Sequence, residues 1–214
     1  MSRQGRSKTY TFKQGGKKRI ILGVTGGLST GKTTVAKILR SSGAQIIDAD
    51  RIAHRIIKPS GKIYKRLVNA FGDNILKMDK TIDRDKLAKA VFNNKNLLKR
   101  LNRIVHPKVI SIIKNQIRSS SKKVIVLDVP LLIEAGLRKL ADKIIVVKTT
   151  RKKQLERAAN NKPLLKRIEV LRRINAQMPL EDKVRIADFV IDNSGTVEET
   201  KVQIKQIRRL LWKS

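Results

Sequence analysis

Between a short apolar run and a helical pattern lies the stretch Gly26-Gly27-Leu28-Ser29-Thr30-Gly31-Lys32-Thr33-Thr34. It fits the pattern Gly-x4-Gly-Lys-Thr, in which glycines let the backbone turn so that successive N–H groups face one anion. A helix that begins directly after such a loop presents its positive N-terminal end to the same anion. The stretch therefore predicts a strand, a phosphate-binding loop and a helix, in this order.

The polar residues of the loop predict ATP as phosphoryl donor and Mg²⁺ as its metal. Lys32 can neutralise the β- and γ-phosphates, and Thr33 can place its hydroxyl on Mg²⁺. A chance glycine turn is the competing interpretation, which the flanking strand and helix patterns disfavour. The expected nucleotide contacts are Gly27, Ser29, Thr30, Gly31, Lys32, Thr33 and Thr34.

Short continuous apolar runs predict the sheet. Runs of this kind are typical of strands buried on both faces of a parallel sheet. Helical patterns lie between them, and residues 197–211 have the spacing of an amphipathic helix. The alternation predicts an α/β, doubly wound, five-stranded parallel sheet. Its expected strands contain Ile20–Val24, Gln45–Ile47, Val124–Leu127, Ile144–Val147 and Phe189–Ile191.

Four segments organise the chain. Residues 1–19 contain no acidic residue and predict a disordered basic tail, which leaves 20–214 as the folded domain. Residues of about 60–121 predict a wholly helical insert, in which Pro107 forces a kink or a new helix start. Residues of about 150–185 predict a basic helical segment, placed where a mobile lid would cover a nucleotide.

Composition excludes several classes of site and partner. The 214 residues include no cysteine, which excludes disulfides and thiolate metal sites. No apolar run reaches the length of a membrane span, and no secretory signal is visible, so we expect a cytoplasmic protein. Fifty Lys and Arg against 17 Asp and Glu give a net charge of +33, which predicts non-specific binding of polyanions. The basic residues are dispersed, however, and indicate solvated helix faces more than a nucleic-acid site.

Carboxylates follow two of the expected strands. Because ligands bind beyond the carboxyl ends of strands in such sheets, these side chains fall at the functional edge. Asp48 or Asp50 can orient or deprotonate an acceptor hydroxyl, or can cap the helix that begins near Ile52. Asp128 can hold Mg²⁺ or its water, or can be a turn residue at the strand end. Spacing alone leaves both pairs of alternatives open.

Taken together, the motifs resemble the dephospho-coenzyme A kinase family. The loop alone indicates only the P-loop kinases, whereas the later motifs in this order and spacing are more specific. They include Ile47-Asp48-Ala49-Asp50-Arg51-Ile52-Ala53-His54, His106-Pro107, Asp128-Val129-Pro130-Leu131-Leu132 with Glu134, Arg173-Ile174-Asn175-Ala176-Gln177, and Ile191-Asp192-Asn193-Ser194-Gly195.

The resemblance implies a P-loop kinase fold that transfers the ATP γ-phosphoryl group to the ribose 3′-hydroxyl of dephospho-CoA. It implies Asp50 as the candidate general base with Asp48 in support. It makes the insert the acceptor-binding part, with His106 and Leu131 as acceptor contacts, although the residues alone favour a structural role for His106. It places Arg157 and Asn193 at the nucleotide. We expect a monomer or a weak oligomer with no membrane partner.

One departure concerns the lid. The family usually carries a second arginine shortly after the position of Arg157, whereas this chain continues Ala158-Ala159-Asn160-Asn161-Lys162. Lys162 or Arg167 is therefore expected to substitute, or the lid is weakened. Other small-molecule kinases of the P-loop class, and a basic nucleic-acid-binding ATPase, are the alternative functions.

Overall fold

The computed structural model describes residues 19–92, 94–161 and 167–211. The chain divides into two compact units, which we describe separately. The first contains the chain up to Ile47 and from Ser120 onward, and the second contains Asp48–Ser119. Of the predicted tail, all but Arg19 falls outside the described residues. The second unit begins earlier than the insert expected at about 60–121, because it includes a helix that follows directly on Asp48.

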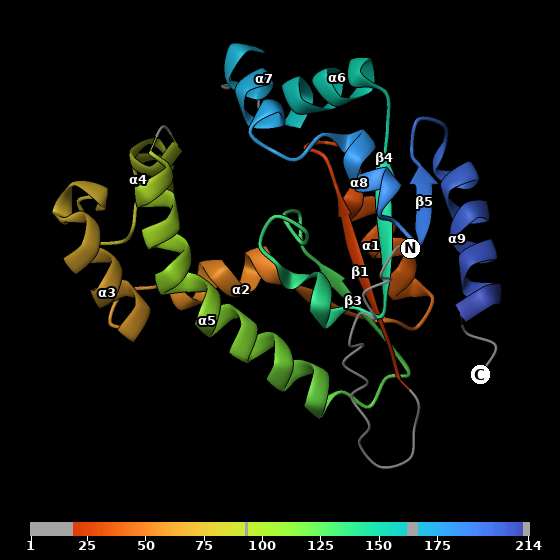
Figure 1. Ribbon diagram of the computed structural model, residues 1–214, viewed down its shortest axis with the longest axis horizontal. Helices are drawn as coiled ribbons and strands as arrows, with labels where there is room; N and C mark the ends of the chain where they lie inside the picture. The colour runs from red at the N-terminus through yellow and green to blue at the C-terminus, as the bar shows by residue number, and fades with distance from the viewer. Residues whose placement is uncertain (1–18, 93, 162–166, 212–214) are drawn as a thin grey trace, which may run out of the picture. The chain divides into compact units, whose positions relative to one another are not determined.

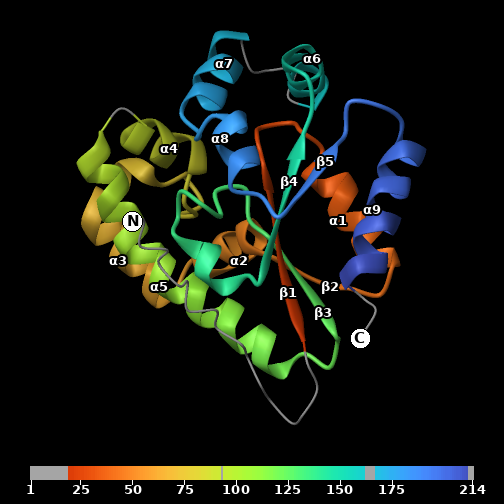
Figure 2. The same cartoon turned by 45° about the vertical axis from the view of Figure 1, so that its right-hand side comes forward.

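A five-stranded sheet forms the centre of the first unit, in the order β2-β3-β1-β4-β5. Its pairings of β1 with β3, β1 with β4, and β4 with β5 are parallel, which confirms the predicted α/β class. Figure 2 shows β1 between β3 and β4. The strands are β1 (Ile20–Gly26), β2 (Gln45–Asp48), β3 (Val124–Asp128), β4 (Lys143–Lys148) and β5 (Phe189–Asp192).

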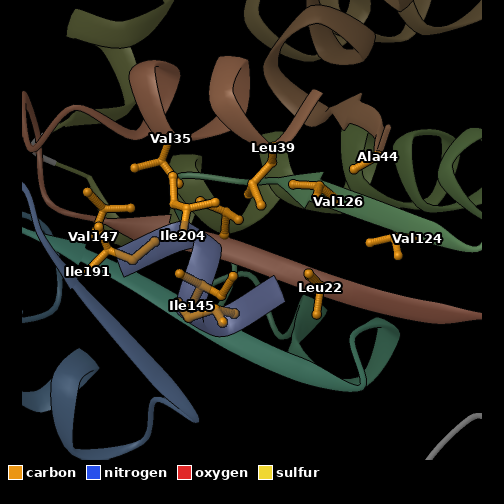
Figure 3. Packing of buried hydrophobic residues seen from close by; sticks show 12 residues of the cluster. Leu22, Val35, Leu39, Ala44, Val124, Val126, Ile145, Val147, Ile191 and Ile204 are labelled. Carbon is orange, nitrogen blue, oxygen red and sulfur yellow. The ribbon is translucent and has the colours of Figure 1, made fainter. Parts of the chain in front are cut away.

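Helices α1 (Lys32–Ser41) and α9 (Val197–Leu211) pack against each other in this unit (Figure 1). Each buries one apolar face, as the residue spacing predicted. The core joins these faces to the inner strands, whose side chains are almost entirely buried (Figure 3). It contains Leu22, Val24, Val126, Ile145 and Val147 of the sheet, Val35 and Leu39 of α1, and Ile204 and Ile207 of α9.

Asp142 fixes the beginning of β1. Its carboxylate accepts a hydrogen bond from the Ile21 N–H at 2.7 Å. Burial raises the pKa of Asp142, although this hydrogen bond opposes the shift. The strand that leads to the phosphate loop is therefore held at its start by a carboxyl group that is costly to ionise.

The remaining described helices of the first unit follow β3 and β4. A short 3₁₀ turn, η2 (Leu137–Leu140), precedes β4. The region of about 150–185 is helical where it is described, as predicted, in α6 (Arg151–Asn161), α7 (Arg167–Asn175) and α8 (Leu180–Arg185). Within the described part of the chain, no helix is both long and apolar enough to span a bilayer.

The second unit is mainly helical and has its own core. Its helices are α2 (Ala49–Ile56), α3 (Lys62–Phe71), the 3₁₀ turn η1 (Asp73–Ile75), α4 (Arg84–Phe92) and α5 (Lys95–Ser119), and α5 packs against α2, α3 and α4. Ile63, Leu67, Ile75, Leu87 and Ile104 belong to this core.

One expectation for this unit was wrong, and one of the two alternatives at Pro107 is excluded. It is not wholly helical, because Leu76 and Ile82 form an antiparallel bridge around a turn stabilised by Asp79 and Thr81. Pro107 does not start a new helix, since α5 continues through it. A proline inside a helix removes one N–H donor, and the tertiary contacts of this 25-residue helix compensate for that loss.

Candidate active site

The loop between β1 and α1 adopts a backbone that its glycines permit. Gly31 caps α1 with φ of 91° and ψ of 25°, and Ser29 also has a positive φ of 56°. A Cβ atom on Gly31 would collide with the side-chain amide of Asn193. Glycine is therefore required at Gly31 for two reasons, the left-handed backbone and the close approach of Asn193.

Three side chains from distant parts of the first unit hold the outer carbonyl groups of the loop. Gln154 Nε2 donates to the Leu28 oxygen at 3.0 Å. Asn193 Nδ2 donates to the Thr30 oxygen at 2.9 Å, and Arg157 Nη1 lies 3.5 Å from the same oxygen. These contacts fix the orientation of two peptide groups in the loop.

The fixed carbonyl groups determine where the loop N–H groups point. In a trans peptide the C=O and N–H bonds point in opposite directions. Because the Leu28 and Thr30 carbonyls point outward to their donors, the N–H groups of Ser29 and Gly31 point to the opposite side. The N-terminal N–H groups of α1, which have no partner within the helix, add further donors. The loop is thus arranged to bind an anion.

Lys32 lies over the same loop. Its Nζ donates to the Gly27 carbonyl oxygen at 2.8 Å and lies 3.5 Å from that of Gly26. The Thr30 hydroxyl also donates to the Gly27 oxygen, at 3.0 Å. This arrangement keeps the ammonium group at the loop, where it can neutralise a bound phosphate.

Asp128 ends β3 directly beside the loop. It pairs in register with Val24, and β1 continues only to Gly26. Thr33, which is exposed in the first turn of α1, supplies a hydroxyl group. Among the described residues, no cluster of three or more His, Asp and Glu side chains could hold a metal ion. One carboxylate and one hydroxyl fit Mg²⁺, which takes most of its oxygen ligands from phosphates and water.

The segment Asp192–Gly195 contacts the loop through Asn193. The buried side chain of Asn193 makes one hydrogen bond with its nitrogen and one with its oxygen. Its Nδ2 binds the loop, and its Oδ1 accepts from the Thr200 hydroxyl at 2.9 Å. The Ser194 hydroxyl, and secondarily Lys148, hold the pKa of Asp192 below its usual range. Arg157 Nη2 donates to the Asn193 carbonyl at 3.0 Å. Arg157 and Asn193 therefore both reach the loop, through its backbone.

Sequence reasoning missed Gln154, which is 4% exposed. Its position three residues before Arg157 places both side chains on one face of α6. That spacing was the signal that would have found it. A cavity of about 510 Å³ opens beside Gln154 and Gly27, and its lining also contains Arg151 and residues from 174 to 181.

Sequence reasoning also missed Lys183, whose side chain is fully buried and lies 2.7 Å from Glu134. Lys162 falls outside the described residues, and Arg167 is the first residue of α7. The predicted lid substitution stays a prediction for both.

The acceptor candidates of the second unit occupy α2 and α5. Asp48 caps α2, because its Oδ1 accepts from the Arg51 N–H at 2.9 Å. Asp50 is exposed in the first turn of this helix. His106 is half-buried in the middle of α5, and burial lowers its pKa. The capping alternative for Asp48 is thus realised, and it places Asp50 at a defined helix start.

Leu131 is 44% exposed and belongs to the first unit, three residues after Asp128.

Comparison with known proteins identifies the family. The family model for dephospho-CoA kinase matches residues 20–199. The chain belongs to the dephospho-CoA kinase family. It is 48% identical over 199 residues to a dephospho-CoA kinase of Carboxydothermus hydrogenoformans, covering 90% of this chain and 95% of that protein. A Geobacillus kaustophilus dephospho-CoA kinase is 41% identical over 191 residues, covering 88% and 94%.

Solved structures agree with this membership. A dephospho-CoA kinase from Campylobacter jejuni is 30% identical and superposes with a TM-score of 0.64, covering 90% of this chain and 97% of that one. A shikimate kinase from Bacteroides thetaiotaomicron, at 13% identity and a TM-score of 0.51, shares the fold alone. The chain is therefore a kinase with the P-loop kinase fold, as its sequence predicted.

Proposed function

We propose that this chain transfers the γ-phosphoryl group of ATP to the ribose 3′-hydroxyl of dephospho-CoA, giving CoA and ADP. Membership of the dephospho-CoA kinase family is the observation that carries the proposal. The phosphate loop supports its donor half, because the loop is oriented for an anion by Gln154, Asn193 and Arg157. The alternative functions have no comparable support.

On the donor side, both backbone N–H groups and the charge of Lys32 would bind the phosphates. The N–H groups of Ser29 and Gly31 and the first turn of α1, with Thr33 and Thr34, would bind the phosphates. Lys32 would move from the Gly27 carbonyl to the β- and γ-phosphates and stabilise the charge that develops during transfer. Little covalent chemistry is required of the protein, since phosphoryl transfer depends mainly on positioning and electrostatics.

Thr33 and Asp128 would hold Mg²⁺. When bound, the ion neutralises phosphate charge and orients the oxygens for transfer. Thr33 follows β1 by way of the loop and Asp128 ends β3, and the two strands are neighbours in the sheet. Their hard oxygen donors suit Mg²⁺ better than a softer metal.

On the acceptor side, Asp50 would orient the 3′-hydroxyl and accept its proton. Orientation contributes more than basicity, because a loose transition state needs little help from a base. Asp48 would support it by capping α2 and so fixing the helix turn that carries Asp50. His106 and Leu131 are the further acceptor contacts that we propose.

Positive charge near the transferred group would come from Arg157 and from Lys162 or Arg167. A lysine supplies charge without the bidentate geometry of an arginine. The net charge of +33 suits an anionic acceptor and favours non-specific polyanion binding at low salt. A cytoplasmic location and a monomeric or weakly oligomeric state stay predictions.

The proposal is tested by ADP release with Mg²⁺ and ATP. Dephospho-CoA is compared with AMP, nucleosides and nucleic acid, and the mass of the product identifies the phosphorylated acceptor. We expect turnover with dephospho-CoA and a product heavier by one phosphoryl group. Binding of ATP without transfer to dephospho-CoA, or faster transfer to another acceptor, contradicts the proposal.

A further inference from the structure

Lys183 is a buried cation to which the proposed mechanism assigns no role. Its side chain is fully buried in the first unit, and its Nζ lies 2.7 Å from Glu134 Oε1 and 3.4 Å from the Pro130 carbonyl oxygen. Glu134 is the more exposed partner, with 22% of its side chain exposed. The pair is more deeply buried than Lys143–Asp188, where the side chains are 45% and 25% exposed.

A buried ion pair is weak evidence for a contribution to stability. Removing a charge from water costs free energy, and this cost can exceed the attraction between the two ions. Replacement of such a pair by apolar side chains of similar size is often neutral or stabilising. A buried pair is therefore better explained by the segments of the chain that it holds together.

The pair joins three segments that meet at the phosphate loop. Glu134 Oε1 also accepts a hydrogen bond from the Met178 N–H at 3.2 Å, and Met178 lines the cavity that adjoins Gly27. The Pro130 carbonyl also accepts from the Thr25 hydroxyl at 2.9 Å. Thr25 directly precedes Gly26, and Pro130 comes two residues after Asp128.

We infer that Lys183 and Glu134 are positioning residues for phosphoryl transfer, which anchor the segment from Gln177 to Glu181 against the strand ends carrying the phosphate loop and Asp128. They act through Met178 and Pro130 and are not catalytic residues. The inference rests on the proposed function for its kinetic consequence. Its structural part, the anchoring of Met178 by Glu134, is independent of the substrate.

The double variant K183M/E134M separates positioning from stability. Methionine keeps the approximate length of both side chains and removes both charges. We expect a thermal midpoint within about 5 °C of the parent, affinity for a non-hydrolysable ATP analogue within about twofold, and kcat lower by about 10-fold or more, because small misplacements at a transfer site are costly. A folded double variant with the parent kcat overturns the inference.

K143M/D188M is the matched control. Asp188 also binds a lysine, at 2.9 Å, and a backbone N–H, that of Ile144 at 2.8 Å. This pair lies at the beginning of β4, away from the loop end of the strand. We expect kcat within about twofold of the parent for folded control protein, since no group of the site depends on it. An equal loss of kcat in both double variants contradicts a specific role for Lys183 and Glu134.

Hydrogen exchange tests the anchor directly, and it decides the matter if the double variant does not fold. In E134A the Met178 amide loses its acceptor, so its exchange should accelerate by about 10-fold while the amides of β4 keep their rates. Exchange at Met178 that is as fast in the parent as in E134A overturns the inference. Absence of transfer to dephospho-CoA by the parent would instead refute the proposed function and leave this result standing.

Discussion

The two units hold their functional residues by different kinds of contact. In the first unit, Gln154 and Asn193 bind loop carbonyls that are 126 and 163 residues away in sequence. In the second unit, the bonds that define the turns are local. Asp83 caps α4 through the N–H groups of Asp85 and Lys86, and Tyr64 reaches the Lys80 carbonyl 16 residues away.

This difference indicates where nucleotide binding and transfer are each sensitive to substitution. The phosphate loop is shaped by long-range bonds, so changes far away in sequence alter its backbone donors. The second unit contributes individual side chains, such as Asp50, on a helix that is capped locally by Asp48. Substitutions of the residues that hold the loop carbonyls are therefore expected to change nucleotide binding, and substitution of Asp50 is expected to change transfer.

Lys32→Met should have the largest effect. It removes the positive charge at the loop, and we expect kcat/KM to fall by about 10³-fold, the scale of losing a preorganised charged donor. Steady-state assays of ADP release measure the change. Lys37→Met is the control, because Lys37 is exposed on the same helix and should leave the rate unchanged. A loss below about 10-fold would mean that the backbone N–H groups alone carry the donor side.

Asp50→Asn should separate transfer from nucleotide binding. We expect kcat to fall by about 10²-fold while the dissociation constant of ATP stays unchanged, since the amide orients the hydroxyl less strongly than a carboxylate and cannot accept its proton. Calorimetry with an ATP analogue and single-turnover transfer give the two quantities. Asp85→Asn, also exposed in the second unit, is the control. Retained transfer removes Asp50 from its proposed role.

Gln154→Leu should weaken ATP binding without changing the acceptor side. It leaves the Leu28 carbonyl without its 3.0 Å donor and allows the neighbouring peptide to rotate. We expect KM for ATP to rise by about 10-fold, which corresponds to one lost hydrogen bond. KM for dephospho-CoA should not change. Gln45→Leu removes the contact between Gln45 and the Ser120 hydroxyl in the same unit, and serves as the control. Equal effects of the two substitutions would contradict a specific role for Gln154.

Lys162→Ala and Arg167→Ala should differ in turnover. If one of them replaces the usual second lid arginine, its loss should lower kcat several-fold more than the loss of the other, because few lid cations reach the phosphates. Steady-state measurements of kcat for both variants under the same conditions show which residue substitutes. Equal rates close to that of the parent would show that neither residue substitutes.

The smallest expected effect is on the pH dependence of stability. Burial lowers the pKa of His106, so the unfolded chain binds a proton more readily, and stability falls as the pH drops through about 6.5. His106→Gln should remove this contribution, by at most a few degrees in thermal midpoint between pH 7 and 5.

The contribution of Asp142 to the pH dependence of stability has the opposite sign. Because burial raises its pKa, its contribution to stability is present below the unfolded value of 3.8 and is lost as the pH rises through the raised value. Asp142→Asn should remove that loss. Thermal melts across pH 3 to 7 measure both substitutions. A change of the pH profile in the same direction by His106→Gln and Asp142→Asn would contradict the opposite signs assigned to these two groups.

Much of the fold was readable from the sequence because its signals are local. Continuous apolar runs gave all five strands, and the glycine pattern gave the loop between β1 and α1. The spacing from Val197 to Leu211 gave α9, whose Thr200, Ile204 and Ile207 are buried. Pattern reasoning failed at the bridge between Leu76 and Ile82, because tertiary contacts override local preference there.

The supports of the site could not be read from the sequence in the same way. Lys183 is a polar residue in polar surroundings of the sequence, so nothing local marks it as buried. Gln154 shares a helix face with Arg157, but its partner Leu28 lies 126 residues away, and Glu134, the partner of Lys183, lies 49 residues away. Only the folded chain brings these groups together, whereas Lys32 is recognisable from the loop motif around it.

The contact between Asn193 and Thr30 has a consequence for the order of synthesis. Thr30 of the loop motif leaves the ribosome 163 residues before its support Asn193, which is itself held by Thr200 in α9. Because domains generally complete their packing only when their last segments have emerged, a nascent chain would carry the motif long before it could bind ATP firmly. The capacity to bind nucleotide would thus arise only after Asn193 and α9 have emerged.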